Sequence, residues 1–182
     1  MNSQYAPFKR HSIQDCIDIG EKMFTAAELF FGHGTDNAAD EALWLAFYQL
    51  GLSWDISDKI LQELVSESNY NAIMALYGRR TAERIPAAYL TGEAWFAGLA
   101  FIVSPDVLVP RSPLAELINV RFSPWLDVIL TNDVPEHVAH EPLNILDLCS
   151  GSGCIGIASA LYLEQAQVLL SDICPKAIAI AR

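Results

Sequence analysis

The sequence predicts an α/β chain in which a helical first half is followed by a β-hairpin and by the beginning of a parallel, doubly wound sheet. Three observations support this fold class. Apolar residues recur at helical spacing from residue 12 to about 85, and an aromatic-rich segment around Gly98 follows from 94 to 103. Further along, an apolar run at 143–148 leads into a glycine-rich turn and a second helix–strand pair, which is typical of parallel sheets.

Four helices are predicted in the first 85 residues. Short polar side chains precede three of them and can accept hydrogen bonds from the first free backbone N–H groups. Together the helices predict a small bundle over residues 1–88, which would be the first domain. The predicted limits are Ser12 to about Phe31, Asp36 to about Gly51, a shorter helix from Ser57, and about Asn69 toward Ile85.

The fourth predicted helix carries the only concentration of basic residues, Arg79, Arg80 and Arg84. Helical spacing places Arg80 and Arg84 on one face. Two interpretations remain open: a solvated face that pairs with local acids, or a contact with a macromolecular substrate.

A hairpin is predicted after Pro86, within a linker at residues 89–112. The return strand has Leu99, Phe101 and Val103 on one face, so that one side of the ribbon is covered. A short extended run at 107–109 follows. Ser112 is then expected to cap a helix with Pro113 at its first position, an arrangement that fixes where Arg111 points.

Residues 113–182 predict the incomplete start of a second α/β domain. After the helix at Pro113 and a polar loop at about 131–142, the expected order is strand, helix, strand and helix. The predicted limits are 143–148, about 154–164, about 167–171, and a helix after Pro175. Two buried parallel strands and one crossover helix do not cover a doubly wound sheet, and the apolar residues Ala177, Ile178 and Ile180 have few candidate partners. The chain is therefore expected to be a fragment.

Composition narrows the class of protein further. The 182 residues are 52% apolar with a net charge of −11, which favours a globular protein and disfavours direct nucleic-acid binding. The acidity indicates either solubility or attraction to a basic partner. The four cysteines form no CxxC pair and no metal-ligand cluster, and no apolar run is long enough for a membrane span. A cytoplasmic protein without a metal or a membrane partner is expected.

The turn after the strand at 143–148 is the candidate ligand site. Gly151, Gly153 and Gly156 have the G-x-G-x-x-G spacing of a dinucleotide-binding turn, and Asp172 ends the next strand, where an acid binds ribose hydroxyls. This pattern alone fits a nicotinamide dinucleotide or S-adenosylmethionine (SAM). Asp147 lies two residues before the turn, where a dinucleotide-binding strand is usually apolar, and an acid there could face a sulfonium or ammonium group. The sequence therefore favours SAM and methyl transfer.

Three motifs resemble the protein N5-glutamine methyltransferase family. They are Tyr89-Leu90-Thr91-Gly92-Glu93-Ala94-Trp95-Phe96, Val109-Pro110-Arg111-Ser112-Pro113 and Asp147-Leu148-Cys149-Ser150-Gly151-Ser152-Gly153. The Pro-Arg-Ser-Pro form followed by Leu114-Ala115-Glu116-Leu117-Ile118 is similar to the branch acting on large-subunit ribosomal protein three (uL3). The resemblance covers the chain from about residue 36 onward. It implies a helical bundle that recognises the substrate protein and a truncated Rossmann-like SAM-dependent methyltransferase domain at 113–182.

The resemblance also implies roles for individual residues. Asp147 would orient the amino end of SAM, and Asp172 would bind its ribose. Phe96 and Arg111 would line the substrate side of the site. The reaction would move a methyl group to the side-chain amide nitrogen of a glutamine in a basic ribosomal protein. The methionine part of SAM would be wrapped by Cys149, Ser150, Gly151, Ser152 and Gly153.

Two departures from the family pattern limit this interpretation. Cys149 stands where the family most often has glycine, and the Asn-Pro-Pro-Tyr motif that holds the glutamine amide is absent from the 182 residues. The chain alone is therefore expected to be inactive. The alternatives are a release-factor glutamine methyltransferase, an adenine N6-methyltransferase of nucleic acid, and a binding module without catalysis.

Overall fold

The computed structural model describes residues 8–32, 34–55, 57–126 and 143–182. The chain divides into two compact units, Met1–Thr91 and Gly92–Arg182, and each is considered by itself. Both helices and strands are present, in agreement with the predicted mixed α/β class. The division into residues 1–88, 89–112 and 113–182 remains a prediction, and the expected polar loop at 131–142 lies outside the described residues.

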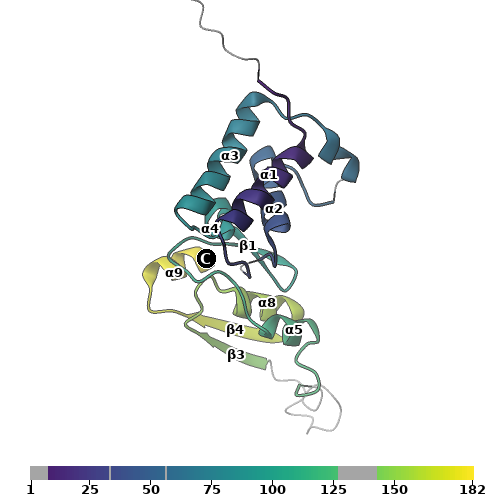
Figure 1. Cartoon of the computed structure of the whole chain (residues 1–182). Helices are drawn as coiled ribbons and strands as arrows, with labels where there is room; N and C mark the ends of the chain where they lie inside the picture. Colours follow the sequence, from purple (N-terminus) through teal and green to yellow (C-terminus); the bar gives the residue numbers. More distant parts are fainter. Residues whose placement is uncertain (1–7, 33, 56, 127–142) are drawn as a thin grey trace, which may run out of the picture. The chain divides into compact units, whose positions relative to one another are not determined.

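The first unit is helical, as expected, but several limits differ from the prediction. Helix α1 ends well before Phe31, and Asn37, not Asp36, caps α2 through a 2.9 Å bond from the backbone N–H of Asp40. The segment after Ser57 is a 3-10 helix, and a short helix after Pro86 was not predicted. The elements are α1 Ile13–Ala26, α2 Ala38–Leu50, η1 Asp58–Gln62, α3 Glu67–Ala82 and α4 Ala87–Thr91 (Figure 1).

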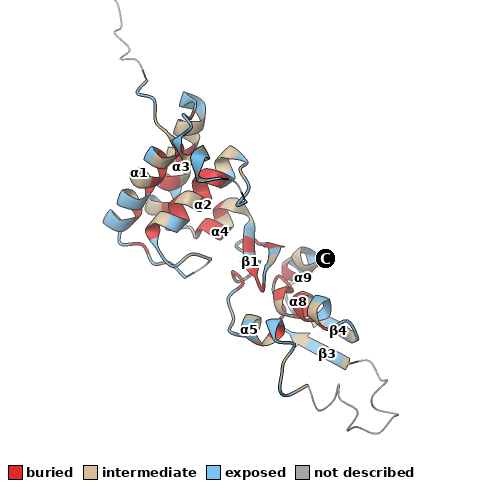
Figure 2. Cartoon of the chain, turned by 90° about the vertical axis from the view of Figure 1, so that its right-hand side faces the viewer, coloured by how far each residue is buried: buried red, intermediate tan, exposed pale blue. Residues whose placement is uncertain are grey.

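The core of this unit forms where α1, α2 and α3 meet. Phe24, Leu45, Ile73 and Tyr77 are each fully enclosed, and Figure 2 shows buried segments on all three helices. The Tyr77 hydroxyl donates a 2.8 Å hydrogen bond to the carbonyl of Ala42, so its one polar atom is satisfied. Burial raises the pKa of Tyr77. The helices are therefore joined by close apolar packing and by a buried hydrogen bond from Tyr77.

A buried ion pair also joins α2 and α3. Arg80 Nε lies 2.6 Å from Glu41 Oε1, and the two side chains are 4% and 1% exposed. Of the two interpretations left open for the basic cluster, the solvated face is therefore wrong for Arg80, whose charge is balanced inside the bundle. For Arg79 a local acidic partner is confirmed, because its Nε lies 3.7 Å from Glu83 Oε1 at the surface.

The second unit begins with the predicted hairpin. Ala97 and Gly98 connect its antiparallel strands, and both have positive φ angles, as tight hairpin turns require. The expected alternation is confirmed, with Phe101 and Val103 buried and Ile102 exposed. The elements are β1 Glu93–Phe96, β2 Leu99–Ile102, α5 Leu114–Asn119, β3 Leu143–Leu148, α8 Cys154–Tyr162, β4 Ala166–Ser171 and α9 Pro175–Ala181.

Strands β3 and β4 are parallel and in register from Leu143 opposite Ala166 to Leu148 opposite Ser171. The predicted limits of β3 are confirmed, but the prediction that it is buried is wrong for one of its faces. Helix α8 packs on the other face, while Leu146, Leu148 and Leu169 are 56%, 65% and 66% exposed. Figure 2 shows this as pale segments on both strands. Among the described residues nothing covers this face, which we call the bare face and define by these three leucines.

Two further observations concern the whole described chain. None of its described helices is long and apolar enough to cross a membrane. No group of three or more histidine, cysteine, aspartate or glutamate side chains within the described ranges could hold a metal ion.

Candidate functional site

The candidate site is the turn that joins the end of β3 to the start of α8. Cys149, Gly151 and Gly153 all have positive φ angles, of 59°, 55° and 77°. This left-handed region suits glycine and disfavours other residues. The φ of Cys149 gives a physical reason why glycine is favoured at that position. The Cys149 side chain is exposed, so it can be accommodated without entering the core.

The three glycines of the pattern have different surroundings. A Cβ atom added at Gly156 would lie 2.3 Å from Leu170 Cδ2 and 3.1 Å from Val168 Cγ1, so this glycine lets α8 approach β4. A Cβ at Gly153 would contact Ile157 and Leu170 at 3.0 and 3.1 Å. At Gly151 an added Cβ would meet no described atom within 4 Å. The backbone at Gly151 therefore borders open space that a ligand can enter.

Asp172 fixes the shape of this turn. One carboxylate oxygen accepts the backbone N–H of Gly151 at 2.8 Å, and the other accepts that of Cys174 at 2.8 Å. The hydrogen bonds from Cys174 and Gly151 hold the pKa of Asp172 below its usual value. Asp172 is thus ionised at neutral pH and links the ends of two parallel strands. Each carboxylate oxygen has a second lone pair with which to accept a ligand hydroxyl.

Asp147 has a role in the fold that sequence reasoning missed. Gly153 is the N-cap of α8 and has no side chain with which to cap it. Asp147 Oδ2 instead accepts the backbone N–H of Gly156 at 2.9 Å, which is one of the four N–H groups without a partner inside the helix. Its predicted contact with the amino end of SAM remains a prediction.

Ser150 supplies an independent sign of a polar ligand. The residue is 8% exposed, and its backbone N–H donates to the carbonyl of Ser171 at 3.0 Å. Its hydroxyl oxygen is buried and has no hydrogen-bond partner among the described residues. An unpaired buried hydroxyl costs free energy, and a polar group bound at the turn would satisfy it. Ser150 therefore fits a ligand with a polar end.

The two other predicted site residues, Phe96 and Arg111, differ from the turn residues in their surroundings. Phe96 is 5% exposed and packs in the core cluster of the second unit with Phe101 and Ile118. Arg111 is exposed. A side chain as buried as Phe96 offers little surface to a substrate, so the hairpin-core role is the one its position favours. The substrate-lining roles of Phe96 and Arg111 remain predictions.

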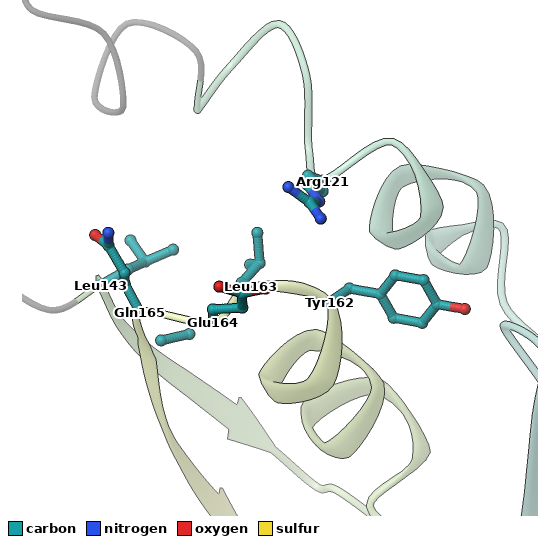
Figure 3. A pocket seen from close by; sticks show the side chains of 7 residues that line it. Arg121, Leu143, Tyr162, Leu163, Glu164 and Gln165 are labelled. Carbon is teal, nitrogen blue, oxygen red and sulfur yellow. The ribbon is translucent and has the colours of Figure 1, made fainter.

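One cavity of the second unit lies away from the glycine turn. A cavity of about 150 Å³ lies at the opposite ends of β3 and β4, where Leu143, Gln165 and Arg121 line it (Figure 3). Ligands of open α/β sheets bind at the carboxyl ends of the strands, and this cavity is at the amino ends. We therefore assign the candidate site from the backbone geometry of the turn.

Comparison with known protein families bears on the kind of ligand that the turn holds. A sequence model of a family described as lysine methyltransferase matches residues 120–181, which include β3, the turn and β4. This similarity supports a methyl donor as the ligand class.

Comparison with curated proteins is more specific. The chain is 44% identical over 171 residues to the ribosomal protein uL3 glutamine methyltransferase of Xanthomonas campestris pv. campestris, covering 94% of this chain and 52% of the relative. It is 43% identical to the protein of the same name from Xylella fastidiosa Temecula1, and that match covers 94% of this chain and 51% of the relative. It is 39% identical to the protein of the same name from Bordetella pertussis Tohama I, and that match covers 93% of this chain and 54% of the relative. The predicted resemblance is confirmed, and the chain spans about half the length of these relatives.

Proposed function

We propose that the protein is a SAM-dependent methyltransferase that modifies the side-chain amide nitrogen of a glutamine in ribosomal protein uL3. The observation that carries the proposal is the 39–44% identity to enzymes of that name along nearly all of the chain, through both compact units. The unpaired Ser150 hydroxyl and the open space at Gly151 support a ligand at the turn. A soluble cytoplasmic enzyme is consistent with this substrate.

We further propose that residues 113–182 form the first part of a Rossmann-like domain. The parallel pair of β3 and β4, with α8 on one face, is the repeating unit of such folds. In these folds helices cover both faces of the sheet. The bare face is therefore expected to be covered when the remaining half of the relatives' length is present.

The residues of the turn would hold the cofactor as follows. SAM supplies an electrophilic methyl group when it is bound. Ser150 would donate its hydroxyl hydrogen to a polar group of the methionine part, while the backbone at Gly151 allows close approach. Asp172 would accept a ribose hydroxyl with the lone pairs that its bonds to Gly151 and Cys174 leave free. Asp147 would hold α8 in place and bind the amino end through water. The methionine part of SAM would also be contacted by Cys149, Ser152 and Gly153.

This chain supplies the donor side of the reaction, and the Asn-Pro-Pro-Tyr motif of the acceptor side is absent from its 182 residues. Methyl transfer depends chiefly on aligning the nucleophile with the methyl group and on excluding water. The chain by itself is therefore expected to bind the donor but not to transfer the methyl group.

The direct test is methyl transfer by a completed enzyme. The chain would be extended with the portion of the Xanthomonas campestris relative that it does not match, and incubated with labelled SAM and unmethylated uL3. We expect one labelled glutamine, located by mass spectrometry of the digested protein. Label in a release factor or in nucleic acid would support the alternative enzymes, and no label in any of the three would reject the proposal.

A further inference from the structure

The segment that leaves α1 is held on the helical unit by two arginine side chains. Arg80 Nη2 donates to the carbonyl of Phe30 at 3.1 Å, while its Nε is paired with buried Glu41. Arg84 Nη2 donates to the carbonyl of Ala27 at 3.0 Å. Each guanidinium has a planar set of donors that fixes the groups it contacts. The backbone at residues 27–30, which we call the α1 loop, therefore has a defined position.

Within this loop two neighbouring apolar side chains behave differently. Leu29 is 8% exposed and packs inward, whereas Phe30 is 84% exposed. Phe30 is the most exposed large apolar side chain of the described first unit. A lone exposed apolar residue is common on protein surfaces and needs no explanation. Here, however, the backbone that carries the ring is held in place, because Arg80 donates a hydrogen bond to the Phe30 carbonyl and the neighbouring Leu29 side chain is buried.

An exposed aromatic ring that projects from a firmly held backbone has the properties of a binding anchor. Aromatic residues that fill a partner's pocket dominate many interfaces, and a group already held in place loses less conformational entropy when it binds. The charge of the surrounding unit indicates the kind of partner. Residues 1–91 carry seven lysines and arginines against twelve aspartates and glutamates, a net charge of −5, and Glu28 within the loop is exposed. A basic partner would be attracted.

We propose that Phe30 is an anchor by which the helical unit holds a basic protein that offers an apolar pocket. That partner is the protein substrate of the proposed reaction, so the inference rests on the proposed function and adds the surface that recognises the substrate. The α1 loop positions the ring, and the acidic surface supplies the long-range attraction.

The test measures binding of the 182-residue chain to recombinant uL3 from Xanthomonas campestris by calorimetry. Phe30→Ala is expected to weaken binding about tenfold, the loss typical of an interface anchor. Leu64→Ala is the matched control, because Leu64 is an apolar side chain of the same unit and is 59% exposed. Its affinity is expected to stay within about twofold of the unaltered chain.

A second variant separates the effect of positioning the Phe30 ring from the electrostatic attraction of a basic partner. Arg84→Met keeps the side-chain length but removes the donors to the α1 loop. It also makes the unit more acidic, so attraction of a basic partner alone predicts tighter binding. If the loop positions the ring, the same variant binds about threefold or more weakly, because the ring must then be ordered on binding.

Weaker binding of both Phe30→Ala and Arg84→Met, with Leu64→Ala unchanged, supports the proposal. It is overturned if uL3 does not bind, if Phe30→Ala binds as well as the unaltered chain, or if Arg84→Met binds more tightly. Loss of self-association in Phe30→Ala without any uL3 binding would assign the ring to a second copy and also overturns it. SAM binding, measured separately, distinguishes failure of this inference from failure of the proposed function.

Discussion

The two compact units cover their apolar residues to different extents. In the helical unit, Phe24, Leu45 and Tyr77 are enclosed by three helices, and even the charges of Glu41 and Arg80 are paired inside. In the second unit, helix α8 covers one face of the parallel pair, and the leucines of the bare face remain exposed. The comparison indicates that the helical unit has a finished core, whereas the sheet requires further chain or a partner to complete its own.

The largest change in the free energy of unfolding is expected when the buried ion pair of the helical unit is broken. Arg80→Met should lower the free energy of unfolding of the helical unit by about 3–5 kcal/mol, because it leaves the Glu41 carboxylate buried without a partner. The double variant Glu41→Leu with Arg80→Met should recover most of this loss. Urea unfolding and hydrogen exchange of α2 and α3 would measure both. A single variant as stable as the unaltered chain would show that the pair is open to water.

A pair of leucine truncations compares the two units directly. Leu45→Ala, in the helical core, should cost about 2–5 kcal/mol, whereas Leu169→Ala, on the bare face, should cost less than about 0.5 kcal/mol. The measurement is again the free energy of unfolding, resolved by hydrogen exchange of each unit. A comparable loss at Leu169 would mean that something covers the sheet, and a concentration dependence of that loss would identify a second copy.

Glycine substitutions test how closely the helical core is packed. An added Cβ at Gly20 would lie 2.6 Å from the ring of Tyr77 and 2.7 Å from Ala42 Cβ, so Gly20→Ala should cost about 1–3 kcal/mol. Gly78→Ala is the control in another helix of the same unit, where a Cβ would meet no described atom within 4 Å. It should stabilise the unit by about 0.5–1 kcal/mol through helix propensity. Thermal unfolding that fails to separate the two variants would contradict the described packing.

Sequence reasoning was most successful where a local signal decides the structure. The Ser12 cap, the hairpin and the limits of β3 depend on neighbouring residues, and all three were predicted. The short helix α4 was missed because five residues are too few to show helical periodicity. Burial was harder still, because it depends on residues far away in the sequence.

At the candidate site, too, local features were predicted from the sequence and contacts between distant residues were not. The glycine spacing predicted a turn at this place, and the structure shows there the left-handed backbone that glycine adopts most readily. The partner of Asp147 is a backbone N–H nine positions further along the chain, and the buried partner of Arg80 is Glu41 on another helix. Neither pairing leaves a pattern in the sequence. An acid at the end of a strand, followed by a glycine turn and a helix without a side-chain cap, was the one available signal for the first of them.

The central claim, that the turn after β3 is the methyl-donor site, is tested most directly by Ser150→Ala. Removing a buried hydroxyl without a partner should leave the free energy of unfolding unchanged or raise it by up to about 1 kcal/mol. If the hydroxyl binds the donor, the same change should weaken SAM binding about three- to tenfold, as the loss of one hydrogen bond does. Equilibrium dialysis of SAM and urea unfolding of the two chains measure both quantities. Weaker SAM binding without lost stability is the predicted result, whereas equal SAM binding by the two chains, or none by either, would contradict the account.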